Sequence, residues 1–220
     1  MKIKVCGMVE DKNILSVSNL RIDYIGFIFY GRSPRYAGDD LSKSITDRIP
    51  EGIKKVGVFV NEEFETIKEL VKGYQLDFVQ LHGQETPDFC EKISNLGIRV
   101  IKAFHVDDKF MWNMLAPYAN VVRYFLFDTK TDKAGGSGKK FDWQLLKKYT
   151  LDVPFFLSGG IALEDADKLL QLDHPMLRAI DINSRFEISP GNKDAALIEK
   201  FIEAIKGKED IEPEDTSLIF

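Results

Sequence analysis

The chain has 220 residues, of which 44% are hydrophobic and 30% are charged, and its formal net charge is −5. This length suits a single domain with a sizeable core, and the negative charge argues against nucleic-acid binding, which would require a basic surface. No run approaches the length of a membrane span, and Met1–Cys6 reads as a strand rather than a signal peptide. We therefore expect a soluble, cytoplasmic protein with no membrane partner.

The two cysteines, Cys6 and Cys90, lie far apart in the sequence and have neither zinc-site spacing nor a secretory context. A disulfide framework is therefore not predicted. Cys90 falls in a helical pattern over 87–96 and is predicted to be structural. No combination of histidines and carboxylates has metal-ligand spacing, so the sequence predicts no metal site.

Eight short apolar or β-branched runs recur along the chain, and their starts are roughly 20 to 31 residues apart, a period that fits one strand, one loop and one helix. They read as continuous apolar runs, as expected for parallel strands covered by helices. The eight runs are 3–6, 24–29, 55–60, 78–81, 99–104, 124–127, 154–157 and 178–182.

Helical periodicity appears between the strands, for example over 64–71, 163–170 and 197–205, and the last of these helices ends at Gly207. Eight such pairs predict an α/β fold, a single (βα)8 TIM barrel over residues 1–206, with a doubly wound open sheet as the alternative. Residues 207–220 carry five acids and one lysine and are predicted to form an acidic C-terminal extension.

In a barrel of this kind the chemistry lies at the carboxyl ends of the strands, where Cys6 and Asp128 fall. Cys6 is either a small buried hydrophobe or, as its place favours, a thiolate base. Asp128 adjoins an apolar run, which predicts a raised pKa and a general-acid role. The alternative for Asp128 is a helix cap, but Asp142 is better placed for that purpose.

Three further positions suggest ligand binding. Arg35, in a loop flanked by proline and glycine, could hold a substrate carboxylate. His82 is the one histidine at a predicted strand end, whereas His105 and His174 are expected in loops. Ser158-Gly159-Gly160 lies between a strand and a helix, and this arrangement suits a phosphate because backbone N–H groups point outward there. The alternative is a simple tight turn.

Together the motifs of the chain resemble one family, phosphoribosylanthranilate isomerase, across residues 1 to 206. The matching motifs are Lys4-Val5-Cys6-Gly7, Gly26–Tyr30, Ser33-Pro34-Arg35-Tyr36, Val56–Asn61, Val79-Gln80-Leu81-His82-Gly83, Phe127–Lys130, Gly135–Trp143, Leu157–Gly160 and Ser189–Asp194.

The resemblance implies the Amadori rearrangement of N-(5-phosphoribosyl)anthranilate in tryptophan biosynthesis, without a cofactor. It makes Cys6 the general base, Asp128 the general acid and Arg35 the partner of the anthranilate carboxylate. Gln80 and His82 are also expected to bind the phosphosugar substrate. The resemblance assigns the phosphate to Gly136, Ser137, Gly138, Ser158, Gly159, Gly160, Asn183 and Ser184.

The chain departs from the family pattern after the last strand, where Asn183 and Arg185 replace a serine and a glycine. Asp181 is expected either to bond to backbone in the core or to contact the substrate. Alternatives to the isomerase are a metal-dependent pentose-phosphate epimerase, a barrel that binds a phosphorylated ligand without turnover, and a subunit of a pathway assembly. The stand-alone chain is expected to be a monomer, with a homodimer as the alternative.

Overall fold

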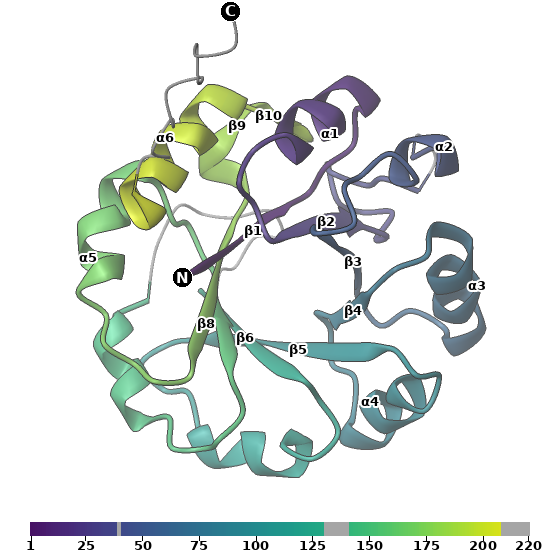
Figure 1. Cartoon of the computed structure of the whole chain (residues 1–220). Helices are drawn as coiled ribbons and strands as arrows, with labels where there is room; N and C mark the ends of the chain where they lie inside the picture. Colours follow the sequence, from purple (N-terminus) through teal and green to yellow (C-terminus); the bar gives the residue numbers. More distant parts are fainter. Residues whose placement is uncertain (39–40, 130–140, 208–220) are drawn as a thin grey trace, which may run out of the picture.

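The computed structural model describes residues 1–38, 41–129 and 141–207. Eight parallel strands form a closed barrel in sequential order, so the predicted TIM barrel is confirmed and the open sheet is excluded. Helices surround the barrel (Figure 1). The strands are β1 (Lys2–Cys6), β2 (Tyr24–Ile28), β3 (Lys54–Phe59), β4 (Phe78–Leu81), β5 (Arg99–Val106), β6 (Tyr124–Thr129), β7 (Phe155–Leu157) and β8 (Leu177–Ile182).

The helical segments alternate with the strands, and a short hairpin follows β8. The helices are α1 (Asp11–Ser18), α2 (Lys43–Thr46), α3 (Phe64–Tyr74), α4 (Pro87–Ser94), α5 (Ala166–Leu170) and α6 (Ala195–Lys206). The 3-10 helices are η1 (Trp112–Tyr118), η2 (Trp143–Lys148), η3 (Leu163–Asp165) and η4 (Ser184–Phe186), and the hairpin pairs β9 (Glu187–Ser189) with β10 (Asn192–Lys193). No helix in the described ranges is long and apolar enough to cross a membrane.

The strand predictions agree with the structure to within two residues at each end. The helix signals also hold, since Asp142 accepts a hydrogen bond from the Gln144 N–H at the start of η2 and α6 ends at Gly207, where φ is +81°. His174 lies in a loop as predicted. The prediction for His105 was wrong, because β5 continues beyond its apolar run and includes this residue.

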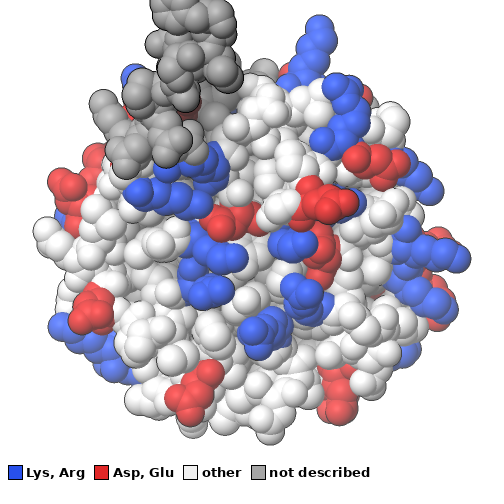
Figure 2. All heavy atoms as spheres, in the orientation of Figure 1, with Lys and Arg blue, Asp and Glu red and all other residues white. Residues whose placement is uncertain are grey.

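One end of the barrel interior is filled by an aromatic layer with cations above it. Lys2 lies 5.6 Å from the ring centre of Tyr24, and Arg123 lies 5.4 Å from that of Tyr124. Cations over aromatic faces are attracted by the ring quadrupole. Figure 2 shows Lys and Arg gathered near the middle of the drawn face, with Asp and Glu between them. The interior layer comprises Tyr24, Val56, Phe78, Ile101, Ala103, Tyr124, Leu126, Phe156 and Ala179.

A buried ion pair joins the first and last strands. The Lys4 Nζ donates hydrogen bonds of 3.0 and 2.9 Å to the two carboxylate oxygens of Asp181, which is the register partner of Lys4 on β8. Burial lowers the pKa of Lys4, but the negative charges of Asp181 and Cys6 outweigh it, so the pKa is raised. Asp181 is therefore the counter-ion of a lysine inside the barrel, a role that was not among the two expected from the sequence.

We expect Lys4→Met to lower the free energy of unfolding by about 3–5 kcal/mol, because it leaves the buried Asp181 carboxylate unpaired. The double variant Lys4→Met/Asp181→Leu should recover most of the loss, since an apolar pair avoids the cost of burying charge. Urea unfolding measures both. Lys2→Met is the matched control: its side chain is 42% exposed, so its effect should stay below about 1 kcal/mol. Equal effects of Lys2→Met and Lys4→Met would contradict this account.

Candidate active site

The two residues predicted for catalysis and one predicted to bind substrate lie at one end of the barrel. Cys6 is the last residue of β1, His82 follows β4, and Asp128 is the second-to-last residue of β6. Because all eight strands are parallel, their carboxyl ends share one face. The barrel therefore brings together side chains that are separated by up to 122 positions, from Cys6 to Asp128.

Cys6 is 4% exposed, and its surroundings are adapted to its sulfur. Its register partner on β2 is Gly26, where a Cβ atom would lie 2.8 Å from the Cys6 Sγ. Burial raises the pKa of the thiol, and the positive charges of Lys4 and Lys193 oppose this only in part. In the free protein Cys6 is therefore a thiol with cations beside it.

Asp128 faces His82, with 3.4 Å between the Asp128 Oδ2 and the His82 Nε2. On the other side of the imidazole ring, the Gln80 Nε2 lies 2.8 Å from the His82 Nδ1. With the amide nitrogen as donor, Nδ1 is the acceptor, and the neutral ring then carries its proton on Nε2, toward Asp128. Gln80 and His82 thus form a chain that ends at the candidate acid.

The expected rise in the pKa of Asp128 was wrong. Burial raises the pKa, but hydrogen bonding to His82, the charges of His82 and His105, and the Thr129 N–H together lower it below its ordinary value. The Thr129 N–H donates to the Asp128 Oδ1 at 2.8 Å. The sequence showed the apolar run before Asp128 but not the histidines that the neighbouring strands place beside it.

Asp181 couples the two candidate residues electrostatically. Burial raises the pKa of Asp181, Lys4 opposes this, and the carboxylate of Asp128 adds to the rise. The charge of Asp181 in turn raises the pKa of Cys6. Charges interact strongly over short distances in a protein interior, so Asp181 acts on both Cys6 and Asp128.

The turn after β7 packs directly against Asp128. Gly159 and Gly160 have φ values of +100° and +67°, a region in which glycine is favoured. A Cβ atom on Gly159 would lie 2.8 Å from the Asp128 Oδ1, and the Thr129 hydroxyl donates to the Gly159 carbonyl at 3.3 Å. The glycines thus allow Ser158–Gly160 to lie beside the strand end that carries Asp128.

Arg35, which was predicted to hold a substrate carboxylate, is only 7% exposed and is paired with a carboxylate of the protein itself. Its Nε and Nη2 donate to the Glu187 carboxylate at 2.8 and 2.6 Å. Lys193 donates to the same carboxylate and, at 2.6 Å, to the Asn183 Oδ1. These cations lower the pKa of Glu187 against the opposing effect of burial. Glu187 and Lys193 were not predicted as site residues from the sequence, although Lys193 lies in one of the matched motifs.

Of the remaining residues predicted to bind phosphate, some lie near the strand-end cluster and others lie outside the described residues. Asn183 and Ser184 follow β8 and are partly buried. A Cβ atom on Gly7, next to Cys6, would lie 2.8 Å from the Asn183 Oδ1 and from the Arg35 Cδ, so these groups are close neighbours. Arg185 is exposed and lies 3.9 Å from the Glu164 carboxylate. Gly136, Ser137 and Gly138 lie outside the described residues.

The loop after β4 is held by another buried lysine, Lys102, which was not predicted as a site residue from the sequence. Lys102 donates to the carbonyl oxygens of Leu81, Gly83 and Ala103 and lies 3.1 Å from the Glu85 carboxylate. Glu85 in turn accepts from the Gly83 N–H at 2.9 Å. These bonds fix the backbone on both sides of His82. A lysine inside an apolar run, as at Lys4 and Lys102, was the available signal.

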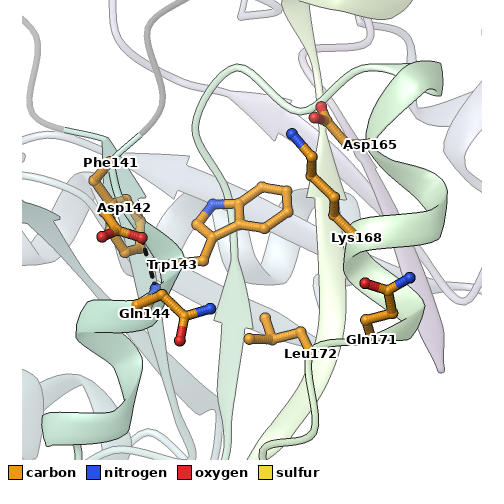
Figure 3. Close-up of a pocket in the computed structure, with 8 residues that line it drawn as sticks. All are labelled: Phe141, Asp142, Trp143, Gln144, Asp165, Lys168, Gln171 and Leu172. Atoms are coloured by element: carbon orange, nitrogen blue, oxygen red, sulfur yellow. Dashed lines mark hydrogen bonds between the residues drawn. The ribbon is translucent and has the colours of Figure 1, made fainter.

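A separate cavity of about 370 Å³ lies between η2 and α5. Figure 3 shows the Trp143 ring across it, with Lys168 on the facing helix. None of the predicted site residues lines this cavity, so it is distinct from the strand-end cluster. Its lining residues are Phe141, Asp142, Trp143, Gln144, Asp165, Lys168, Gln171 and Leu172.

Comparison with known proteins shows the family to which the chain belongs. Residues 3–204 match the family model described as N-(5'phosphoribosyl)anthranilate (PRA) isomerase. The chain belongs to the N-(5'-phosphoribosyl)anthranilate isomerase family. A relative of that name from Parabacteroides distasonis is 45% identical over 206 residues, which cover 93% of each chain.

Solved structures of the isomerase family agree. The phosphoribosyl anthranilate isomerase of Thermotoga maritima superposes with a TM-score of 0.79 and 36% identity over 94% of this chain and all of that one. A second isomerase structure, in complex with reduced 1-(o-carboxyphenylamino)-1-deoxyribulose 5-phosphate, has a TM-score of 0.78 and 33% identity, with coverage of 94% and 100%. The resemblance seen in the sequence motifs is therefore confirmed, and the chain is an isomerase.

The burial of Cys6 in this isomerase predicts a thiol that ionises late. Because its pKa is raised, we expect its rate of alkylation by iodoacetamide to keep rising above about pH 9, beyond the midpoint of an ordinary thiol. Mass spectrometry of the labelled peptide measures this rate. Cys6→Ser supplies the background from Cys90, whose pKa burial raises to about 12. A plateau below about pH 8 would contradict the prediction.

Proposed function

We propose that this chain converts N-(5-phosphoribosyl)anthranilate to 1-(2-carboxyphenylamino)-1-deoxyribulose 5-phosphate in tryptophan biosynthesis, with Cys6 as base and Asp128 as acid. The observation that carries these roles is the placement of both groups at the carboxyl end of one barrel, coupled through Asp181. Membership in the isomerase family supports the reaction. The reduced product analogue bound by a relative supports a phosphosugar ligand.

The first step opens the furanose ring. A proton is delivered to the ring oxygen, and the lone pair of the anthranilate nitrogen forms a C1=N bond as the bond between C1 and the ring oxygen breaks. The product is a positively charged Schiff base. The Asp128–His82 pair supports this step, because the His82 Nε2 lies 3.4 Å from the Asp128 Oδ2, so its N–H can stabilise the carboxylate that remains after proton transfer. Asp128 takes up a proton from solvent when the negatively charged substrate binds, donates it to the ring oxygen as a general acid and returns to the carboxylate.

The second step removes the proton from C2 of the sugar. The iminium group acidifies this proton, so the Cys6 thiolate is a sufficient base, and the product is an enolamine. Protonation of C1 and loss of the C2 hydroxyl proton then give the ketone of the product. Lys4 and Lys193 favour the thiolate form of Cys6, and the iminium adds a third positive charge to the site. The substrate nitrogen supplies the electron sink, so this sequence of steps uses no cofactor.

Arg35 is proposed to hold the anthranilate carboxylate. Its contact with Glu187 uses Nε and Nη2, along one side of the guanidinium group. The N–H groups on Nη1 and the second N–H on Nη2 form the other edge of the fork, which matches a carboxylate bidentately. Glu187 thus orients the arginine while leaving an edge for the substrate.

The phosphate is proposed to bind near Ser158, Gly159, Gly160, Asn183 and Ser184. The positive φ values of the two glycines expose backbone that faces the strand end, and such turns bind phosphate through N–H groups. Gly136, Ser137 and Gly138 complete the proposed set. The phosphate would then lie beside both catalytic candidates, since Gly159 adjoins Asp128 and Asn183 adjoins Gly7.

The decisive test is an assay with phosphoribosylanthranilate, followed by the loss of anthranilate-type fluorescence. We expect the wild-type protein to consume the substrate, and Cys6→Ser and Asp128→Asn each to lose roughly 10²-fold or more in kcat, the usual contribution of a positioned acid or base. Cys90→Ser is the matched control for the cysteine, because Cys90 is buried in α4. Near-normal turnover in either variant would reject the role of that residue.

Arg35→Met should raise KM by roughly 10- to 100-fold, because hydrogen bonds to a charged group contribute about 1.5–3 kcal/mol. The proposed acid and base remain in place, so kcat should fall less than in Asp128→Asn. Steady-state kinetics separate the two constants. Arg185→Met is the control, since this arginine is exposed; an unchanged KM in Arg35→Met would place the anthranilate carboxylate elsewhere.

A further inference from the structure

Three side chains from consecutive strands converge beside the proposed acid. They are His82 after β4, His105 in β5 and Asp128 in β6, and each can present one ligand atom such that all three atoms lie within 4.8 Å of one another. His105 and Asp128 are register partners on adjacent strands. The spacing along the sequence gave no sign of this cluster, because each residue comes from a different strand.

The geometry of the cluster matches a first-row transition metal. Ligands of tetrahedral zinc lie about 2.0–2.2 Å from the ion and therefore roughly 3.4 Å from one another. The His82 Nε2 and the Asp128 Oδ2 are already 3.4 Å apart. Two imidazoles and one carboxylate suit Zn²⁺ or Co²⁺, whereas Mg²⁺ prefers a set composed of oxygen atoms. His105 is exposed, which gives an ion access from solvent.

Gln80, which contacts the His82 ring on the side away from Asp128, is suited to orient a metal-binding histidine. A histidine that binds a metal through Nε2 carries its proton on Nδ1 and usually donates it to a fixed acceptor. Gln80 is 1% exposed, and its amide lies 2.8 Å from the His82 Nδ1. Its Oε1 has no hydrogen-bond partner among the described residues. Rotating the amide by half a turn places this oxygen against Nδ1, so the same side chain can orient a metal-bound ring.

We propose that the substrate-free protein binds one Zn²⁺ ion through His82, His105 and Asp128. Three protein ligands leave a fourth position for water. The bound ion engages the carboxylate oxygen of Asp128 and the nitrogen of His82 that faces it, so Asp128 cannot deliver a proton while the ion is present. Zn²⁺ is therefore an inhibitor that competes with phosphoribosylanthranilate. This inhibition rests on the proposed function, whereas the binding of the ion does not.

Binding is tested without substrate, by titrating chelator-treated full-length protein with CoCl₂ and following the visible absorption of tetrahedral cobalt. We expect one ion per chain, displaced by ZnCl₂ and not by MgCl₂. His105→Gln should weaken cobalt binding at least about 10-fold, as should Gln80→Leu, since an outer partner of a metal ligand is worth roughly 10- to 100-fold in affinity. His174→Gln is the matched control, because this third histidine of the chain packs on Tyr149 and Phe155 away from the cluster.

Unchanged cobalt affinity in His105→Gln, with circular dichroism showing a folded protein, would overturn the proposal. Loss of binding in Cys6→Ser together with retention in His105→Gln would also overturn it, because the ion would then be held by a thiolate. In the turnover assay, ZnCl₂ should raise the apparent KM of the wild type, and His105→Gln should require at least about 10-fold more ZnCl₂ for the same rise. An inactive wild type that still binds cobalt would reject the proposed function and leave the metal site standing.

Discussion

The ion pair between Lys4 and Asp181 is the interaction on which the rest of the site depends. It joins β1 to β8, the two strands that close the barrel, and it lies beneath the end that carries Cys6. Burying two charges costs several kcal/mol for each ion, and only close, hydrogen-bonded contact offsets that cost. The pair therefore needs the closed barrel around it, and in return it places a cation beside the thiol and a carboxylate that is coupled to Asp128.

The other buried charges follow the same rule. Arg35 and Lys193 both donate to the Glu187 carboxylate. Lys102 donates to three carbonyl oxygens and pairs with Glu85. The first network joins the loop after β2 to the hairpin after β8, and the second joins β5 to the loop after β4, so each fixes a loop that carries a candidate substrate contact. Rigid positioning of this kind lets a small number of side chains act on one substrate.

The fold was largely predictable from sequence, because the eight apolar runs repeat at the period of a strand and a helix, and because a buried parallel strand needs no polar face. The site was predictable only as a set of strand ends. Asp128 was found from its place after an apolar run, but its lowered pKa depends on His82 and His105, which come from two other strands. In the same way, the carboxylate that holds Arg35 is 152 positions away in the chain. Contacts of this kind depend on strand order and register, which local patterns do not encode.

The directions of the two pKa shifts constrain the proposed mechanism. In the free protein Asp128 favours the carboxylate and Cys6 favours the thiol, whereas the proposed roles need a protonated Asp128 and a Cys6 thiolate. For Asp128, the carboxylate and phosphate groups of the substrate add negative charge near the site, which raises its pKa and favours the uptake of a proton from solvent. For Cys6, the ring-opened iminium brings positive charge next to the sulfur and favours the thiolate. The substrate thus creates the protonation states that its own reaction needs, and Asp181, coupled to both groups, makes the charge on one depend on the charge on the other.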